Sequence, residues 1–408
     1  MRRLAAITAT VTAGTLGLGW GIARRLTAGA GRKKYDLVLR DVQQDNGRCL
    51  IVLDRTPQTI AHGIYNLWLA NGEWTQLSGE VLNRGPHHIA RAVTNSSPGF
   101  APKTGDRAAW SGIYFASPTD AGLNARKVRV HPTEHNPPAW LIEGAQGTQG
   151  DSATWVIHIH GLASTPAGTL RGVQVTSKMG YPSLVISHQN GTKSPTGGSE
   201  RSSLGVMEIH DGHAALTYAI RHGAQQIILF GWSMGAAIAL QLAHHHQDLV
   251  AGMVLESPVL DWVEVIKTNC ARHHLPTHAG LLAIPWLTLR PLSRMIGLPT
   301  TIPLREFDWI ARATDLTAPT LIIHGKADDS APIRLSQKLR TLRPDLVELK
   351  TFNASHTQSW NTDPARWQST ITQWITTHIK PGNRRNLGGE RCAETPRQGR
   401  DEQPSEYW

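Results

Sequence analysis

Apolar and polar positions divide this chain of 408 residues into stretches with different patterns. Residues 4–23 contain no charged side chain and lie between two arginine pairs, Arg2-Arg3 and Arg24-Arg25. Twenty helical residues extend about 30 Å, the thickness of the hydrocarbon core of a bilayer. The pattern predicts an N-terminal membrane anchor within residues 1–34 and therefore a location at the cell membrane. A cleaved signal segment, which would leave a secreted or soluble product, is the alternative.

Residues 35–145 alternate short apolar runs with turn residues and show no long helical period. The runs at 36–39, 49–53, 63–69 and 127–130 are typical of strands. We expect a β-rich N-terminal extension, either as a small separate subdomain or as strands added to the edge of a larger sheet.

Residues 146–380 alternate apolar strand-like runs with helical periods. Such alternation predicts an α/β fold with a mostly parallel, doubly wound sheet covered by helices on both faces. The expected strands are 154–159, 183–187, 226–230, 250–256, 319–324 and 346–352, with a further strand at 139–142 before them.

An insertion at about 259–318 interrupts this rhythm, and its frequent prolines, among them Pro276, Pro285, Pro291 and Pro299, prevent one long helix. We expect it to form a cap over the active site, with apolar residues that either line an aliphatic acyl pocket or hold the cap on the core. Residues 381–408 are polar and rich in Pro, Gly, Arg and Glu, which predicts a disordered tail.

The segment Gly231-Trp232-Ser233-Met234-Gly235 directly follows the apolar run 226–230 and precedes an apolar helical stretch. A strand, a G-x-S-x-G turn and a helix are the context of a nucleophile elbow, which raises a serine hydroxyl above the sheet. Gly231 and Gly235 are expected there because a Cβ at either position would collide across the tight turn. Ser233 is therefore the candidate nucleophile.

A serine hydroxyl needs a base to accept its proton and an acid to orient that base. Asp328 follows the strand 319–324, and His356 follows the strand 346–352. Catalytic groups collect at the carboxyl ends of parallel strands, which makes these two residues the candidate partners of the serine. Asp329 is the alternative acid.

The motif H-G-x-x-D-x-x-x-P at 324–332 and the motif H-T-x-x-W-x-x-D-P at 356–364 complete a pattern over residues 139–379. This region resembles the α/β-hydrolase superfamily, in particular bacterial membrane-anchored esterases and lipases and serine aminopeptidase-like members. The resemblance implies a catalytic triad of Ser233, Asp328 and His356. It also implies an oxyanion hole formed by the backbone N–H groups of Met234 and of Leu162, which lies in the loop after strand 154–159.

Charge and composition exclude other classes. The net charge of +10 looks like a nucleic-acid signal, but residues 1–34 hold seven basic residues and no acidic one. The remainder is close to neutral, and we expect no nucleic-acid partner. The three cysteines show no metal spacing, and the histidines at 244–246 or at 158 and 160 do not make a convergent set of three ligands. We expect no metal and no organic cofactor.

These observations together predict a serine hydrolase of the carboxylesterase or lipase kind. It would cleave a small-molecule acyl ester through an acyl-enzyme intermediate. A peptidase or amidase acting on a peptide, or an acyltransferase, would use the same residues on the same fold. A non-catalytic membrane-anchored binding protein that retains the fold is the rival from a different class. The pattern says nothing about oligomeric state.

Overall fold

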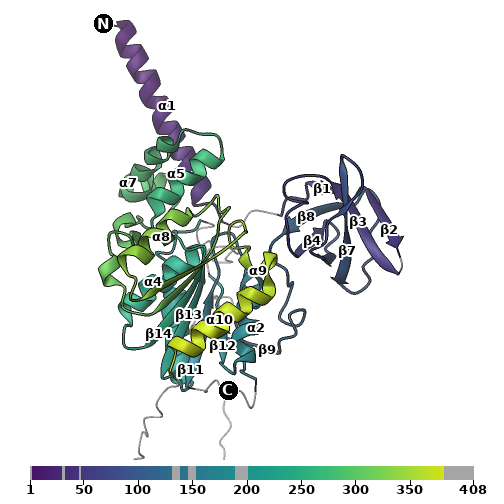
Figure 1. Ribbon diagram of the computed structural model, residues 1–408. Coiled ribbons are helices and arrows are strands. Elements are labelled where there is room, and N and C mark those ends of the chain that lie inside the picture. The colour runs from purple at the N-terminus through teal and green to yellow at the C-terminus, as the bar shows by residue number, and fades with distance from the viewer. Residues whose placement is uncertain are drawn as a thin grey trace, which may run out of the picture.

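The computed structural model describes residues 2–29, 33–45, 47–130, 138–145, 153–188 and 201–380. In these ranges the chain forms an N-terminal helix, an antiparallel β-half-barrel and an α/β domain with a cap (Figure 1). The predicted tail at 381–408 lies outside the described residues.

The β-rich extension forms a sheet of its own, in which every pair of neighbouring strands is antiparallel. Its strand order is β1-β8-β4-β5-β7-β3-β2, with β6 paired to β7. Apolar residues on one side of these strands, including Ile51, Leu53, Leu67 and Ile89, form a small core separate from that of the α/β domain. The strands are β1 (Leu37–Val38), β2 (Asp41–Asp45), β3 (Arg48–Asp54), β4 (Tyr65–Leu69), β5 (Trp74–Leu77), β6 (Leu82–Asn83), β7 (His88–Ser96) and β8 (Arg107–Ser111).

The second sheet has the order β16-β15-β14-β13-β11-β12-β10-β9. Strands β11 to β16 are parallel to one another, whereas β10 is antiparallel to both β9 and β12. The mostly parallel sheet predicted from the sequence is confirmed. The strands are β9 (Ala125–Val128), β10 (Ala139–Ile142), β11 (Thr154–Ile159), β12 (Ser183–Val185), β13 (Gln226–Trp232), β14 (Val250–Glu256), β15 (Thr320–Gly325) and β16 (Val347–Phe352).

The sequence predicted that the β-rich extension ends at residue 145, but the second sheet already begins before that residue. Strands β9 and β10 come from the stretch assigned to the extension, yet they pair with the second sheet. A short alternating run indicates a strand but not the partner to which its backbone bonds, so the sequence left both arrangements open. Both arrangements foreseen for residues 35–145 therefore occur, in different parts of the stretch.

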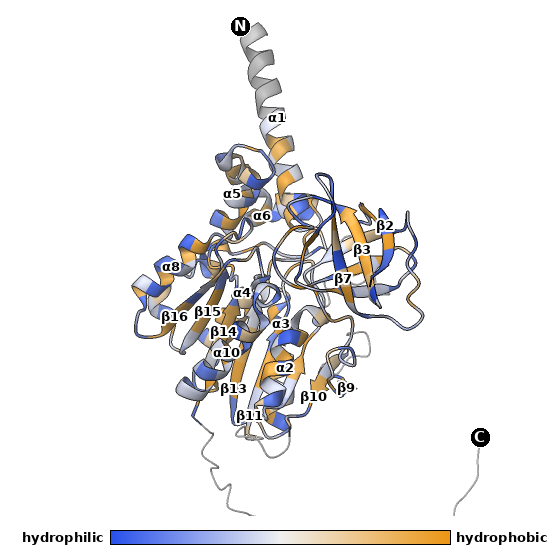
Figure 2. Ribbon diagram, turned by 45° about the vertical axis from the view of Figure 1, so that its right-hand side comes forward, coloured by the Kyte–Doolittle hydropathy of each residue, from blue (hydrophilic) through white to orange (hydrophobic). Residues whose placement is uncertain are grey.

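Helices cover both faces of the second sheet, and Figure 2 shows its apolar strands enclosed between them. Successive residues of β13 point to opposite faces. Ile227 and Leu229 join the core beneath α3, α4 and α8, while Ile228 and Phe230 join the core beneath α2 and α10. The doubly wound arrangement is thus confirmed. These helices are α2 (Leu170–Lys178), α3 (Ile209–Arg221), α4 (Met234–His245), α8 (Ile333–Leu342) and α10 (Pro364–His378).

The insertion between β14 and β15 folds into short helices rather than one long helix. Pro285 and Pro291 lie in the first turns of α6 and α7, where the missing N–H of proline costs nothing. The elements are α5 (Trp262–Arg272), η2 (Thr277–Ala283), α6 (Ile284–Thr288), α7 (Arg290–Met295), η3 (Leu304–Phe307) and η4 (Ala313–Asp315).

The N-terminal helix α1 (Arg2–Leu26) corrects the prediction of a membrane anchor through residues 4–23. No helix in the described ranges is both long enough and apolar enough to cross a membrane. The transmembrane anchor, and the cell-membrane location inferred from it, are therefore not supported.

The last turns of α1 instead pack against the cap. The Ala23 side chain is completely buried, and α1 contacts both η2 and α6. A Cβ built on Gly19 would lie only 2.2 Å from the carbonyl oxygen of Leu282. Arg201 donates hydrogen bonds to the carbonyl of Arg24 (2.8 Å) and to the Thr27 hydroxyl (3.1 Å). This end of α1 is an integral part of the cap.

Candidate active site

Ser233 occupies a sharp turn between strand β13 and helix α4. Its backbone has φ 54° and ψ −114°, a region that side chains other than glycine rarely adopt. A Cβ built on Gly231 would lie 2.6 Å from the Ala236 Cα, and one on Gly235 would lie 2.1 Å from the Ile159 carbonyl oxygen. Only glycine fits at either position, and the turn holds the Ser233 hydroxyl above the end of the sheet.

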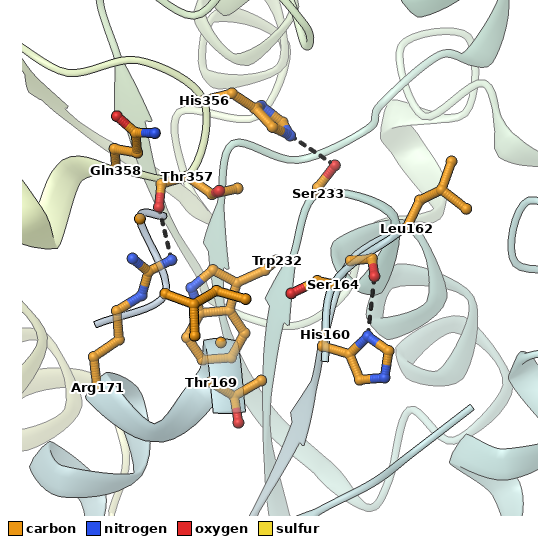
Figure 3. A pocket seen from close by; sticks show the side chains of 14 residues that line it. His160, Leu162, Ser164, Thr169, Arg171, Trp232, Ser233, His356, Thr357 and Gln358 are labelled. Atoms are coloured by element: carbon orange, nitrogen blue, oxygen red, sulfur yellow. Dashed lines mark hydrogen bonds between the residues drawn. The ribbon is translucent and has the colours of Figure 1, made fainter. Parts of the chain in front are cut away.

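The structure brings together the three residues predicted for the triad, although they are far apart in the chain. His356 Nε2 lies 2.9 Å from Ser233 Oγ, and Figure 3 shows the two side chains pointing toward one another. His356 Nδ1 lies 2.8 Å from Asp328 Oδ2. The ionised carboxylate is an acceptor only, so Nδ1 carries the proton and Nε2 is free to accept the serine proton.

Asp328 is fully buried and is surrounded by donors. Its Oδ1 accepts the backbone N–H groups of Ser330 (2.9 Å) and Ala331 (2.8 Å), and His324 Nε2 lies 3.2 Å from Oδ2. Burial by itself would raise the pKa of Asp328, but hydrogen bonds and attraction from His324 and His356 outweigh it and hold the pKa well below its usual range. The carboxylate is therefore charged at neutral pH.

The sequence did not settle the surroundings of Asp328 in two respects: the role of Asp329 and that of His324. Asp329, the alternative acid, is 56% exposed and forms an ion pair with Arg272 at 3.1 Å, so it does not reach His356. The role of His324 as a second partner of Asp328 was missed. Its only signal was the four-residue spacing from His324 to Asp328 within the H-G-x-x-D motif.

The loop after β11 passes close to the nucleophile. A Cβ on Gly161 would lie 2.9 Å from the Trp232 carbonyl oxygen and 3.1 Å from Ser233 Cβ. Leu162 follows in this loop, and Met234 opens helix α4. Within the described residues neither backbone N–H has a hydrogen-bond partner. Two unpaired N–H groups beside the serine are the donors that an oxyanion hole requires.

His160 belongs to the same loop and is buried against it. Its Nδ1 lies 3.0 Å from the Gly161 carbonyl oxygen, as Figure 3 shows. Burial, and secondarily the nearby His188, lower the pKa of His160 to about 3, so the ring is neutral. His160 thus supports the loop. No group of three or more His, Cys, Asp or Glu residues in the described part of the chain could hold a metal ion.

A pocket of about 160 Å³ opens beside Ser233 and His356 (Figure 3). Trp232 and Arg171 lie along it, and Leu162 lies at its edge. Two further lining residues, Gly112 and Ile113, come from the segment that follows the last strand of the half-barrel. Nothing in the sequence connected these residues to the site, because their role depends on how the two sheets are arranged.

A larger cavity of about 480 Å³ lies between the end of α1 and helix α5 of the cap. Leu162 lines this cavity as well as the catalytic pocket, so the two spaces adjoin at the candidate oxyanion loop. The lining is mostly apolar, with two polar groups and one charged group among its residues. These are Ile22, Arg25, Leu26, Leu162, Ile266, Asn269, Cys270, His273 and Leu275.

The strand order, the serine elbow and the helical cap are those of an α/β-hydrolase fold. A family model described as "alpha/beta hydrolase fold" matches residues 154–282. A second family model, a domain of unknown function (DUF8805), matches residues 38–111, which form the half-barrel.

Curated relatives include uncharacterised proteins from two strains of Mycobacterium tuberculosis, CDC 1551 and H37Rv. Each is 33% identical over 114 residues, which is 28% of this chain and 31% of the relative. The match thus spans less than a third of the length of these relatives.

Solved structures similar to the chain include an esterase of Pyrococcus furiosus, with 18% identity, a TM-score of 0.49, and coverage of 65% of this chain and 96% of the esterase. A proline iminopeptidase of Mycobacterium smegmatis has 16% identity and a TM-score of 0.44, with coverage of 62% and 98%.

Proposed function

We propose that the protein is a serine hydrolase that cleaves carboxylic esters. The observation that carries this proposal is the unbroken chain of hydrogen bonds from Ser233 through His356 to Asp328, at 2.9 Å and 2.8 Å, on a strained elbow. Such a chain activates a hydroxyl group that would otherwise be a weak nucleophile.

In the proposed mechanism Ser233 Oγ attacks the ester carbonyl while His356 Nε2 accepts its proton. The N–H groups of Leu162 and Met234 hold the oxyanion. His356 then protonates the departing alcohol, and Asp328 stabilises the imidazolium without itself being protonated. Water, activated in turn by His356, releases the acyl group and restores the serine.

The adjoining apolar cavity supports an ester with an aliphatic acyl chain as the substrate class. An acyl carbon bound to Ser233 Oγ would lie beside Leu162, which forms the boundary with that cavity. Burial of each methylene group there contributes about 0.8 kcal/mol, so the cavity would favour longer acyl chains over acetate.

The test compares the full-length chain with Ser233→Ala on p-nitrophenyl esters from acetate to palmitate, with aminoacyl anilides measured in parallel. Ester turnover in the wild type should fall by a factor of about 10⁴ or more in the variant. Labelling by a fluorophosphonate probe should disappear with it. Cleavage of anilides alone would identify a peptidase. A folded wild-type chain that neither turns over substrate nor takes the label would contradict the proposal.

A further inference from the structure

The half-barrel contacts the α/β domain at helix α9 (Ser359–Thr362), which follows the loop that carries His356. Asn361, in this helix, is completely buried between the two parts. Its side-chain Nδ2 donates to the carbonyl oxygens of Ile64 (2.8 Å) and Gly112 (3.0 Å), and its own carbonyl accepts the Ile64 N–H at 2.9 Å. One residue thus holds both chain segments by which the half-barrel reaches the site.

The same side chain is connected to the catalytic histidine loop. Asn361 Oδ1 accepts a hydrogen bond from Arg171 Nη1 at 3.1 Å, and Arg171 Nη2 donates to the carbonyl of Thr357 at 2.7 Å. Thr357 directly follows His356 and has a φ of 54°, so its backbone needs external support. Buried Glu256 lies 3.8 Å from the Arg171 guanidinium and accepts the Ser359 N–H at 3.0 Å.

The half-barrel side of this contact is itself rigidly held. A Cβ on Gly63 would lie 2.3 Å from the Asn361 carbonyl oxygen, so the loop touches α9 backbone to backbone. Arg91, which is fully buried, donates to the carbonyls of Thr59, Gly63, Ser78 and, over a short distance, Ala61. Three of these charge-assisted bonds go to the loop at 59–63 and hold its shape where it meets Asn361, and the fourth ties it to the end of β5.

The segment leaving the half-barrel also forms part of the catalytic pocket. Gly112 and Ile113 line it together with Ser233 and His356. The Ile113 Cδ1 atom would lie 3.7 Å from a Cβ placed on Gly168, another lining residue, so the Ile113 side chain lies beside the segment that begins helix η1 (Pro166–Thr169). His356 must protonate the departing alcohol, and the pocket that contains His356 is therefore the one into which the alcohol part of an ester would extend.

We propose that the half-barrel is a working part of this active site. In this proposal Ile113 determines which alcohol group the site accepts, and Asn361 is a positioning residue that couples the half-barrel to His356 through Arg171 and Thr357. The inference rests on the proposed function for the alcohol assignment. In this proposal the half-barrel shapes the part of the pocket that would hold the alcohol group, and the acyl chain would occupy the other cavity.

The first test concerns Ile113. Full-length wild type and Ile113→Trp are compared by the ratio of kcat/KM for benzyl acetate to kcat/KM for ethyl acetate, followed by acid release. The larger side chain should lower this ratio about tenfold or more. Ile60→Trp is the matched control, since Ile60 is 43% exposed on the half-barrel and lines neither space. An unchanged ratio in Ile113→Trp would overturn the assignment of Ile113.

The second test concerns Asn361. Asn361→Asp keeps the acceptor for Arg171 but removes both donors to the half-barrel carbonyls. We expect kcat and the fluorophosphonate labelling rate to fall about 10- to 100-fold, with a smaller change in KM, at a temperature where the variant is fully folded. A role in stability alone would lower only the Tm, and wild-type kcat and labelling in a destabilised variant would overturn the positioning role.

Hydrogen exchange separates failure of this inference from failure of the proposed function. If the wild type hydrolysed no ester and took no label, the proposed function and the alcohol assignment would both be wrong. Hydrogen exchange of the amides at 356–362 would still test whether Asn361 couples the half-barrel to the loop that carries His356. Faster exchange there in Asn361→Asp than in wild type supports the coupling, and equal exchange overturns it.

Discussion

At the scale of single residues, the site depends on which of two adjacent carboxylates is buried. Asp328 and Asp329 are neighbours in the chain, yet one is buried beside two histidines and the other faces solvent beside Arg272. The turn that follows β15 determines which carboxylate is buried, because the backbone N–H groups of Ser330 and Ala331 donate hydrogen bonds to Asp328.

We expect Asp328→Asn to lower kcat for p-nitrophenyl esters by roughly 10⁴, because an amide no longer fixes the tautomer of His356 or stabilises its charged form. Asp329→Asn is the matched control and should stay within about twofold of wild type, since it breaks only an exposed ion pair. Steady-state kinetics on the two variants check the prediction. Equal losses in both would show that the acid is assigned wrongly.

A second residue-scale prediction concerns His158, which is fully buried in β11 between hydroxyl groups of Thr176 and Ser183. Burial lowers the pKa of His158 to about 3, against about 6.5 in an unfolded chain. Between these values the unfolded chain binds more protons, so the free energy of unfolding falls as the pH falls from about 6.5 toward 3.

The variant His158→Gln cannot take up this proton. Between pH 7.5 and pH 4.5 the wild type should therefore lose roughly 2 kcal/mol more stability than the variant, whatever their difference at neutral pH. Denaturant unfolding at the two pH values measures this. Parallel losses in the two proteins would show that His158 is protonated in the folded state.

At the scale of elements, helix α1 shows how one apolar stretch can be read in two ways. Length and lack of charge suggested a membrane span. The structure instead buries Ala23 in the core that includes the cap and brings Gly19 against the backbone of η2. A residue without a Cβ permits this close approach between a helix and a neighbouring backbone.

Two glycines of α1 provide a matched pair. Gly19→Ala should destabilise the protein by about 1 to 3 kcal/mol, since its Cβ would overlap the Leu282 carbonyl. Gly17→Ala meets nothing within 4 Å and should be neutral or stabilising by up to about 1 kcal/mol, because alanine is the better helix former. Thermal unfolding of the full chain distinguishes them, and equal Tm values would contradict the packing of α1 on the cap.

At the scale of the whole molecule, the site lies where three parts of the chain meet. The α/β domain carries Ser233, Asp328 and His356, the segment after the half-barrel adds Gly112 and Ile113 to the pocket, and α1 and α5 line the apolar cavity. In Figure 1 helix α1 and the half-barrel lie on different sides of the α/β domain. Substrate selection is thus expected to depend on segments far from the catalytic motifs.

The acyl cavity can be tested from α1. Leu26→Trp should fill part of it and lower the ratio of palmitate to acetate ester turnover at least tenfold. Leu18→Trp, on the same helix and 39% exposed, is the control. Initial rates across the ester series give the ratio. A chain-length profile in Leu26→Trp that matches the control would show that acyl chains bind elsewhere.

The sequence by itself determined the α/β fold and the candidate nucleophile, acid and base. It could do so because these features are local: apolar strands have a length and period, and the elbow around Ser233 needs glycines at fixed spacing. The carboxyl ends of parallel strands meet at one edge, so Asp328 and His356 could be placed there without coordinates.

Only the tertiary structure decided the rest. The packing of α1 on the cap, the pairing of β9 and β10 with the larger sheet and the contribution of Ile113 to the pocket all join segments distant in sequence. Backbone pairing and van der Waals contact between such segments depend on shape and leave no periodic pattern. Asn361 illustrates the limit, since its importance lies in two carbonyl groups that belong to residues 249 and 297 positions away.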